Sequence, residues 1–151
     1  MGEIERIEDQ LRRSFEGEAW HGPSVLEALE KVTAEKAAAR PLAQAHTIWE
    51  VVLHIGATQE LALRRVQGDS TPLSPEQDWP SVADTGEEAW LSSLTALKCS
   101  YSELCQALSQ VSDSLLERAI LPGHSSLYVT LHGLVQHNLY HAGQIALLKK
   151  A

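Results

Sequence analysis

The sequence contains few cysteines and no long apolar run. Its two cysteines, Cys99 and Cys105, are six residues apart on one predicted helix, where they point to different faces and lie roughly 9 Å apart along the axis. We therefore expect no disulfide between them and a reducing, cytoplasmic location. Because there is no run of about 20 apolar residues and no apolar segment behind a basic N-terminus, we expect neither a membrane span nor a signal peptide.

Basic residues are also scarce. Lysine and arginine number 12 against 20 aspartates and glutamates, which gives a formal net charge of −8 at pH 7. Binding to nucleic-acid phosphates or to an anionic membrane surface requires clustered lysine and arginine. We therefore expect neither nucleic acid nor a membrane as a partner, and a small molecule as the substrate.

The residues that are abundant favour helices in one domain. Hydrophobic residues make up 44% of the chain and charged residues 21%, as in ordinary globular proteins. Alanine and leucine outnumber the β-branched residues that are typical of sheets. A chain of 151 residues is long enough to form one hydrophobic core without disulfides, so residues 1–151 are expected to form a single domain.

Apolar residues recur at helical spacing in several segments of the chain. The expected helical segments are residues 3–16, 24–32, 48–67, 85–111 and 126–150. Two glycines and a proline at residues 17–23 separate the first helical segment from the second. The T-x-x-E pattern of a capping box occurs twice and predicts where two long helices begin. The two boxes are Thr47 with Glu50 and Thr85 with Glu88.

Residues 68–84 contain three prolines and several turn-forming polar residues, so they are expected to form a long irregular crossover. A turn is also expected at Pro122 and Gly123, before the last helix. A long crossover lets the second and third long helices run parallel, which predicts an all-α four-helix bundle with up-down-down-up topology. In this topology the helix over residues 48–67 is antiparallel to the last helix.

Three histidines are candidates for a metal site. His137 and His141 are four residues apart in the last helix, so they lie on one face and can aim at one point. His54 is at about the same depth on the antiparallel helix. The sequence therefore predicts a divalent metal on these three imidazoles, with a coordination position left open. Zinc or nickel, or else iron or manganese, suits imidazole ligands; the alternative is three unrelated histidines.

Two residues are candidates for catalysis. Glu50 lies one turn before His54 and could accept a proton from bound water or join the ligands, although its capping box already explains it. His21, in the break between the first two helical segments, could face the site as a proton donor; the alternative is a loop histidine packed under Trp20. Asn138 and Gln144 flank the histidine pair and could be outer hydrogen-bond donors.

The pattern H-x-x-x-H-A-G-Q-I at residues 137–145, together with HTIWEVVLHI at residues 46–55, resembles the DinB/YfiT-like superfamily of metalloenzymes. The resemblance implies an up-down-down-up bundle, frequent homodimers and a metal on His54, His137 and His141. The superfamily is similar to bacillithiol- and mycothiol-dependent S-transferases and to a thiol-dependent maleylpyruvate isomerase. In these enzymes the metal would lower the pKa of a low-molecular-weight thiol cofactor so that the thiolate attacks an electrophile.

These observations leave three functions open. The first is a metal-dependent enzyme that activates a thiol for S-transfer or a water for hydrolysis, with Glu50 or His21 as proton carrier. The second is a non-catalytic dimeric protein that binds a metal or a small molecule in a stress response. The third is a purely structural bundle whose histidines never converge.

Overall fold

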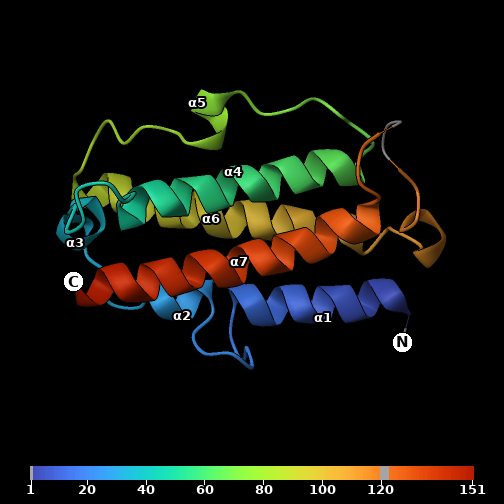
Figure 1. Cartoon of the computed structure of the whole chain (residues 1–151), viewed down its shortest axis with the longest axis horizontal. Coiled ribbons are helices and arrows are strands. Elements are labelled where there is room, and N and C mark those ends of the chain that lie inside the picture. Colours follow the sequence, from blue (N-terminus) through green and yellow to red (C-terminus); the bar gives the residue numbers. More distant parts are fainter. Residues whose placement is uncertain (1, 120–122) are drawn as a thin grey trace.

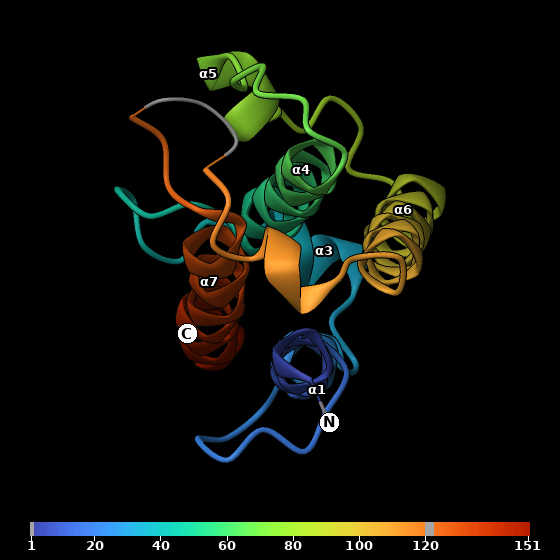
Figure 2. The ribbon, with the colours of Figure 1, turned by 90° about the vertical axis from the view of Figure 1, so that its right-hand side faces the viewer.

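The computed structural model describes residues 2–119 and 123–151, and in this part of the chain it contains seven α-helices, a short 3-10 helix and no strand. Pro122 of the expected turn lies outside the described residues. Four helices are long and lie side by side (Figures 1 and 2). They are α1 (Glu3–Phe15), α4 (Ile48–Val66), α6 (Glu87–Leu108) and α7 (Leu127–Lys150).

In Figure 1, α1 and α7 run in one direction, and α4 and α6 run in the other. Helix α4 packs against both α6 and α7, and α7 also packs against α1. The all-helical prediction is confirmed, and the arrangement is compatible with the predicted four-helix bundle. No helix among the described residues is long and apolar enough to cross a membrane.

Helix α4 begins at the predicted capping box. The Thr47 side chain accepts a hydrogen bond from the Glu50 N–H at 3.1 Å, and the Glu50 carboxylate accepts one from the Thr47 N–H at 2.7 Å. At the other end Gly68 has a φ of +83°, a left-handed conformation that glycine adopts without strain and that ends a helix. This predicted helix is therefore confirmed to within one residue.

The predicted start of α6 is wrong. Its N-cap is Gly86, without a side-chain cap, and the first helical residue is Glu87. The Asp84 carboxylate accepts a hydrogen bond from the Gly86 N–H at 2.8 Å, and such an Asx turn holds the backbone outside the helix. The predicted Thr85 capping box is therefore replaced by a turn, and the helix also ends at Leu108, short of residue 111.

The segment between α1 and α4 forms two short helices, α2 (Val25–Leu29) and α3 (Ala34–Ala38). Helix α2 ends earlier than predicted, and Lys31 just beyond it has a left-handed φ of +61°, which a helix cannot contain. The loop between α1 and α2 lies on the side of α1 that faces away from α4 (Figures 1 and 2).

The crossover between α4 and α6 is irregular except for one helical turn, α5 (Pro75–Asp78). This turn was missed, although Ser74 with Gln77 forms a capping box and Pro75 occupies the first turn, both of which favour a helix start. The crossover runs along the outside of α4 in Figure 1. It brings Asp78 and the following Trp79 against that helix.

Two of the four tryptophans belong to the core. Trp49 and Trp90 are 2% and 1% exposed and meet edge to face with ring centroids 5.1 Å apart. Their indole N–H groups donate to the Ser93 hydroxyl and to the Val32 carbonyl, which removes the cost of burying them. These contacts fix α4 against α6 and so position the first turns of α4.

Candidate metal centre

Three imidazoles meet between α4 and α7. His54 comes from the second turn of α4, and His137 and His141 come from adjacent turns of α7. The Nε2 atom of His137 lies 2.9 Å from Nε2 of His54 and 3.0 Å from Nε2 of His141. We refer to His54, His137 and His141 as the histidine trio. The sequence prediction that they converge is confirmed.

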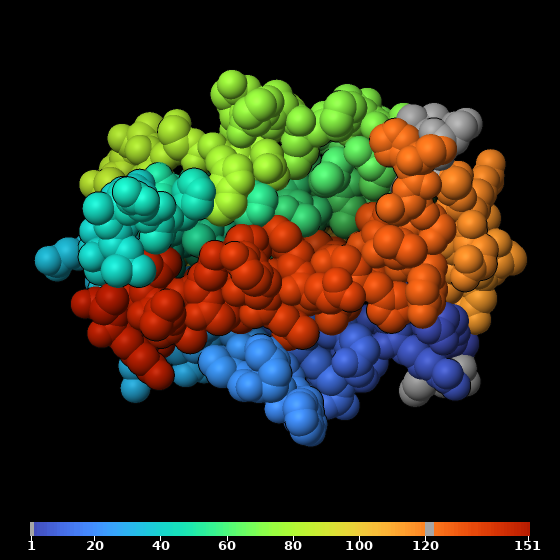
Figure 3. Space-filling model, in the orientation of Figure 1, coloured from blue at the N-terminus to red at the C-terminus, as the bar shows by residue number. Residues whose placement is uncertain are grey.

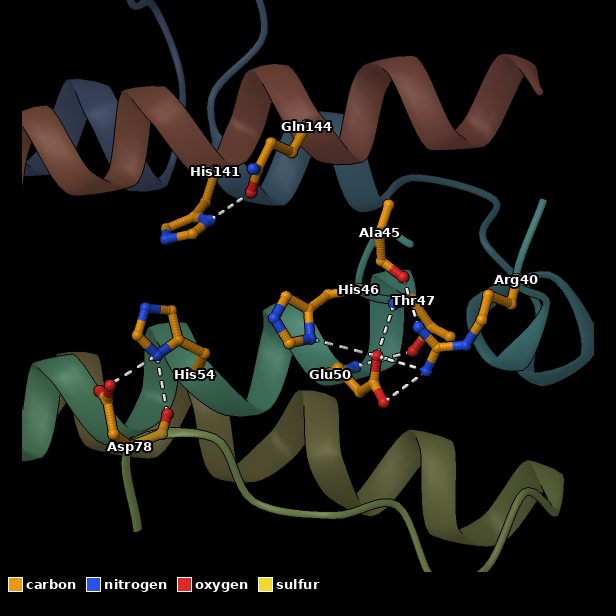
Figure 4. A network of polar contacts seen from close by, with 9 residues as sticks. All are labelled: Arg40, Ala45, His46, Thr47, Glu50, His54, Asp78, His141 and Gln144. Atoms are coloured by element: carbon orange, nitrogen blue, oxygen red, sulfur yellow. Dashed lines mark hydrogen bonds and ion pairs between the residues drawn. The ribbon is translucent and has the colours of Figure 1, made fainter. Parts of the chain in front are cut away.

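Two of the three imidazoles have their tautomer fixed by a hydrogen bond at Nδ1. Nδ1 of His54 lies 2.7 Å from the Asp78 carbonyl oxygen, and Nδ1 of His141 lies 2.6 Å from Oε1 of Gln144. A carbonyl oxygen only accepts hydrogen bonds, so each Nδ1 carries the proton. The Nε2 atoms of His54 and His141 therefore present lone pairs toward Nε2 of His137. Figure 4 shows the contacts of the two Nδ1 atoms with Asp78 and Gln144.

Burial disfavours the charged form of His137 and His141. Burial, and then the nearby imidazoles of His141 and His54, lower the pKa of His137 to about 3. Burial also lowers the pKa of His141, against the opposing effect of its Gln144 hydrogen bond. Both imidazoles are therefore neutral at pH 7, which is the form that binds metals.

The three Nε2 atoms that meet in the trio cannot all satisfy one another. His137 can donate one Nε2 proton to only one of the two facing lone pairs, and its Nδ1 is buried without a partner among the described residues. A divalent cation accepts all three lone pairs. In a tetrahedral zinc site with bonds of about 2.05 Å, the ligand nitrogens lie about 3.3 Å apart, close to the two distances from Nε2 of His137.

Among the described residues, the trio is the one group of three His, Cys, Asp or Glu side chains close enough to share an ion, with ligand atoms within 4.8 Å of one another. The residues present therefore fit a metal. Three protein ligands leave at least one coordination position free, as catalytic metal sites require.

Trp79 covers one side of the trio. Its indole stacks on His54 at a centroid distance of 3.9 Å and on His46 at 3.6 Å, with interplanar angles of 5° and 12°. Two rings stacked so closely on one indole face would collide, so the indole lies between them. Both Trp79 and Asp78 were missed as site residues, because nothing local in the sequence of the crossover indicates which helix it will contact.

Glu50 lies near the trio in sequence but faces away from it. Its carboxylate accepts hydrogen bonds from the Thr47 N–H and from the Arg40 guanidinium, at 2.7 and 2.9 Å, and its Oε2 lies 3.4 Å from Nδ1 of His46. Figure 4 shows Arg40 and Thr47 on the side of Glu50 away from His54, and His46 between Glu50 and His54. The structure therefore supports the helix-capping alternative for Glu50.

His21 and Asn138 also lie away from the trio. His21 is exposed in the loop between α1 and α2, on the side of α1 that faces away from α4 (Figure 2). Comparing positions along the helix axes gives only the axial coordinate of His21 and not the side of α1 on which its loop lies. Asn138 is fully buried and donates to the Ser14 hydroxyl at 3.1 Å, so it joins α7 to α1. Of the predicted outer partners, only Gln144 contacts the trio.

The sequence profile of the DinB superfamily matches residues 19–145. The chain belongs to the DinB superfamily. The match covers most of the sequence and includes the whole histidine trio, so the resemblance inferred from the two histidine motifs is confirmed. Comparison of this DinB chain with curated proteins and with solved structures finds no match.

Proposed function

We propose that this DinB protein is a metal-dependent enzyme that binds one divalent ion on His54, His137 and His141. The observation that carries the proposal is the convergence of three imidazoles, two of them with lone pairs turned inward by Asp78 and Gln144. Membership of a superfamily that is in general metal-dependent supports it. Zinc or nickel is the first choice, and iron or manganese the second.

A divalent ion at this position would supply Lewis acidity that lowers the pKa of a thiol or a water. Because three ligands leave room for another donor, we propose that a low-molecular-weight thiol reacts there with an electrophilic substrate. In this S-transfer the thiol loses its proton, a sulfur–carbon bond forms and the leaving group departs from the same carbon.

The surrounding residues hold the imidazoles in place. The Asp78 carbonyl and the Gln144 amide keep two rings in the metal-binding tautomer, and Trp79 covers His54 on its outer face. The Asp78 carboxylate, with Oδ1 3.2 Å from Nδ1 of His54, would stabilise positive charge on this ring if it held a metal. Neither Glu50 nor His21 is assigned a role in proton transfer.

The first test is the metal content of protein purified without a histidine tag, compared with His137→Ala. The second is an assay of the loaded and the chelated protein with a thiol and 1-chloro-2,4-dinitrobenzene, and with p-nitrophenyl acetate in the absence of thiol. Metal-dependent and thiol-dependent arylation without ester hydrolysis is the expected result.

The other outcomes separate the remaining hypotheses. Metal-dependent ester hydrolysis without thiol would make the protein a hydrolase. A bound metal with no turnover would favour the non-catalytic metal- or small-molecule-binding protein of a stress response. A protein that binds no divalent metal would leave only the structural role. The four-helix-bundle topology, the homodimer and the cytoplasmic location stay predictions; light scattering tests the dimer.

A further inference from the structure

A cavity of about 290 Å³ opens beside the trio between α4 and the first half of α7. Thr58 and His137 line its inner end, and Arg65 and His124 line its outer end. Its walls are mainly apolar. The remaining lining residues are Leu61, Ala62, Ser125, Thr130, Gly133 and Leu134. Figure 3 shows the face on which green α4 lies above the orange first half of α7.

A larger cavity of about 650 Å³ lies elsewhere, between α4, α5 and α6. None of the trio lines it, and its rim carries acidic side chains. The smaller cavity is the one that His137 joins directly to the trio. A molecule bound at the metal would therefore extend into the cavity between α4 and α7.

Arg65 is held in place by backbone carbonyls, and its charge acts on the exposed carboxylate of Asp69 without forming an ion pair with it. Its Nη1 donates to the carbonyl oxygens of Asp69 and Thr71, at 2.6 and 3.1 Å, which leaves donors on Nε and Nη2. No carboxylate among the described residues forms an ion pair with it within 4.0 Å. Arg64 beside it, in contrast, pairs with Glu60 at 2.5 Å. In a chain with a net charge of −8, a guanidinium that is fixed in a cavity and forms no ion pair within 4.0 Å favours an anionic ligand.

The separation between the two ends sets the size of this ligand. Thr58 and Arg65 are seven residues apart on α4, which is about 10 Å along the axis. Thr58 lies beside the trio, since its hydroxyl is 3.4 Å from Nε2 of His137. A ligand that reaches both ends carries its reactive group and its anionic group about 10 Å apart.

We propose that this cavity binds a small carboxylate-bearing molecule, with its reactive end at the trio and its carboxylate on Arg65. The planar guanidinium matches a carboxylate through two parallel hydrogen bonds, and His124 adds a further donor at the same end. The apolar walls contact an aliphatic or aromatic linker. The proposal rests on the metal site of the proposed function and adds the substrate class to it.

The test uses Co²⁺-loaded protein and two probes of equal length, 6-mercaptohexanoate and 6-mercaptohexanol. Each probe binds the ion through sulfur, and visible absorption of Co²⁺ measures its affinity without any turnover. The wild-type protein is expected to bind the acid at least about tenfold more tightly than the alcohol, as a charge-assisted hydrogen bond provides.

Arg65→Met is expected to abolish this preference, and Arg65→Lys to keep part of it. Arg64→Met is the matched control, because it removes the same charge one residue away and lines only the other cavity. The control is expected to keep the full preference. This comparison separates direct recognition from a general effect of net charge.

A plug tests the route through the cavity. A Cβ added at Gly133 meets nothing within 4 Å, and Gly133 lines the cavity, so Gly133→Leu is expected to occupy part of the cavity without a clash at Cβ. It is expected to weaken both probes at least about tenfold. Gly143→Leu is the control, since Gly143 is also an exposed glycine of α7 with open space around it, outside the cavity. Light scattering checks that each variant keeps the wild-type mass.

The two proposals fail in different ways. Equal affinities for the acid and the alcohol, or a preference that Arg64→Met removes as completely as Arg65→Met, would overturn the carboxylate site and leave the metal site standing. Tight probe binding in Gly133→Leu would show that ligands approach from another side. A protein that takes up no Co²⁺ would overturn both proposals.

Discussion

Two polar clusters lie near the start of α4, where His46 of one and His54 of the other are eight residues apart. They differ in whether their polar groups have hydrogen-bond partners. The first, the cap cluster, consists of Arg40, His46, Thr47 and Glu50; the second is the histidine trio. In the cap cluster every Glu50 oxygen has a donor from the same stretch of chain. In the trio, lone pairs from two distant helices face one another. The polar groups of the first cluster have partners within the chain, whereas the facing lone pairs of the second form a site that could hold a cation.

Trp79 lies between the two clusters, with one face on His46 and the other on His54. Both histidines contact the same indole, yet only His54 turns a lone pair toward other ligands. His46 instead lies beside the Glu50 carboxylate. Stacking on Trp79 therefore does not show which histidine is a candidate metal ligand. The partners of the ring nitrogens make this distinction.

The largest effect is expected from His137→Ala, with His46→Ala as its matched control. Loss of a direct ligand is expected to weaken zinc binding by much more than the roughly 100-fold that loss of an outer partner costs. His46→Ala is expected to leave zinc affinity within about threefold of wild type, below the cost of any outer partner. Competition with a chromophoric chelator measures both. Equal losses in the two variants would show that the clusters act as one site.

A smaller effect is expected from Gln144→Leu, which removes the acceptor behind His141. Outer hydrogen-bond partners of ligating histidines contribute roughly 10- to 100-fold to metal affinity, so zinc affinity should fall by that factor. The exposed Gln136 on the same helix, changed to leucine, is the control. Unchanged zinc affinity in Gln144→Leu would mean that His141 needs no such partner.

Glu50→Ala is expected to change stability and not metal binding. It removes half of a capping box and the partner of Arg40, which should cost about 1 kcal/mol in the free energy of unfolding. Chemical denaturation of the metal-free protein measures it. A loss of zinc affinity comparable with that of Gln144→Leu would return Glu50 to the metal site.

Glu50 is also expected to make the free energy of unfolding depend on pH. Burial raises the pKa of Glu50, but the hydrogen bonds from Thr47 and Arg40 outweigh burial and lower it below its ordinary value of 4.5. A carboxylate with a lowered folded-state pKa stabilises fully above the unfolded value, and this contribution is lost as the pH falls through the folded value. The stability difference between wild type and Glu50→Ala should therefore shrink below pH 4.5.

The smallest effect is expected from His21→Ala. The side chain is exposed in a loop on the far side of α1, and surface substitutions of this kind usually change stability by less than about 0.5 kcal/mol. Zinc affinity and turnover should both remain at the wild-type level. A clear loss of turnover at normal zinc affinity would require the loop to approach the trio in solution.

The parts of the molecule that local sequence encodes were predicted well. Residues four apart on a helix always share a face, so the pairing of His137 with His141 followed from spacing alone. Matching depth on an antiparallel helix then added His54. The Thr47 capping box is also a contact between near neighbours in the chain, and it was predicted correctly.

The contacts that depend on tertiary position were missed. Asp78 and Trp79 reach His54 across 24 and 25 residues of sequence, through a crossover whose path is set by packing against α4. The role of His21 stays a prediction, because depth along an axis does not say on which side of a helix a loop lies. The Asx turn at Asp84 likewise displaced a capping box that the residue pattern favoured.

The sequence separation of the trio has a consequence for the life of the protein. His54 and His137 are 83 residues apart. An ion held by both would therefore cross-link most of the chain into one loop, and the cross-link would be lost when the ion dissociates. Such an ion binds the folded chain in preference to the unfolded one, and its withdrawal would expose the protein to proteases. Scarcity of metal would then shorten the half-life of the protein and also remove its proposed metal-dependent activity.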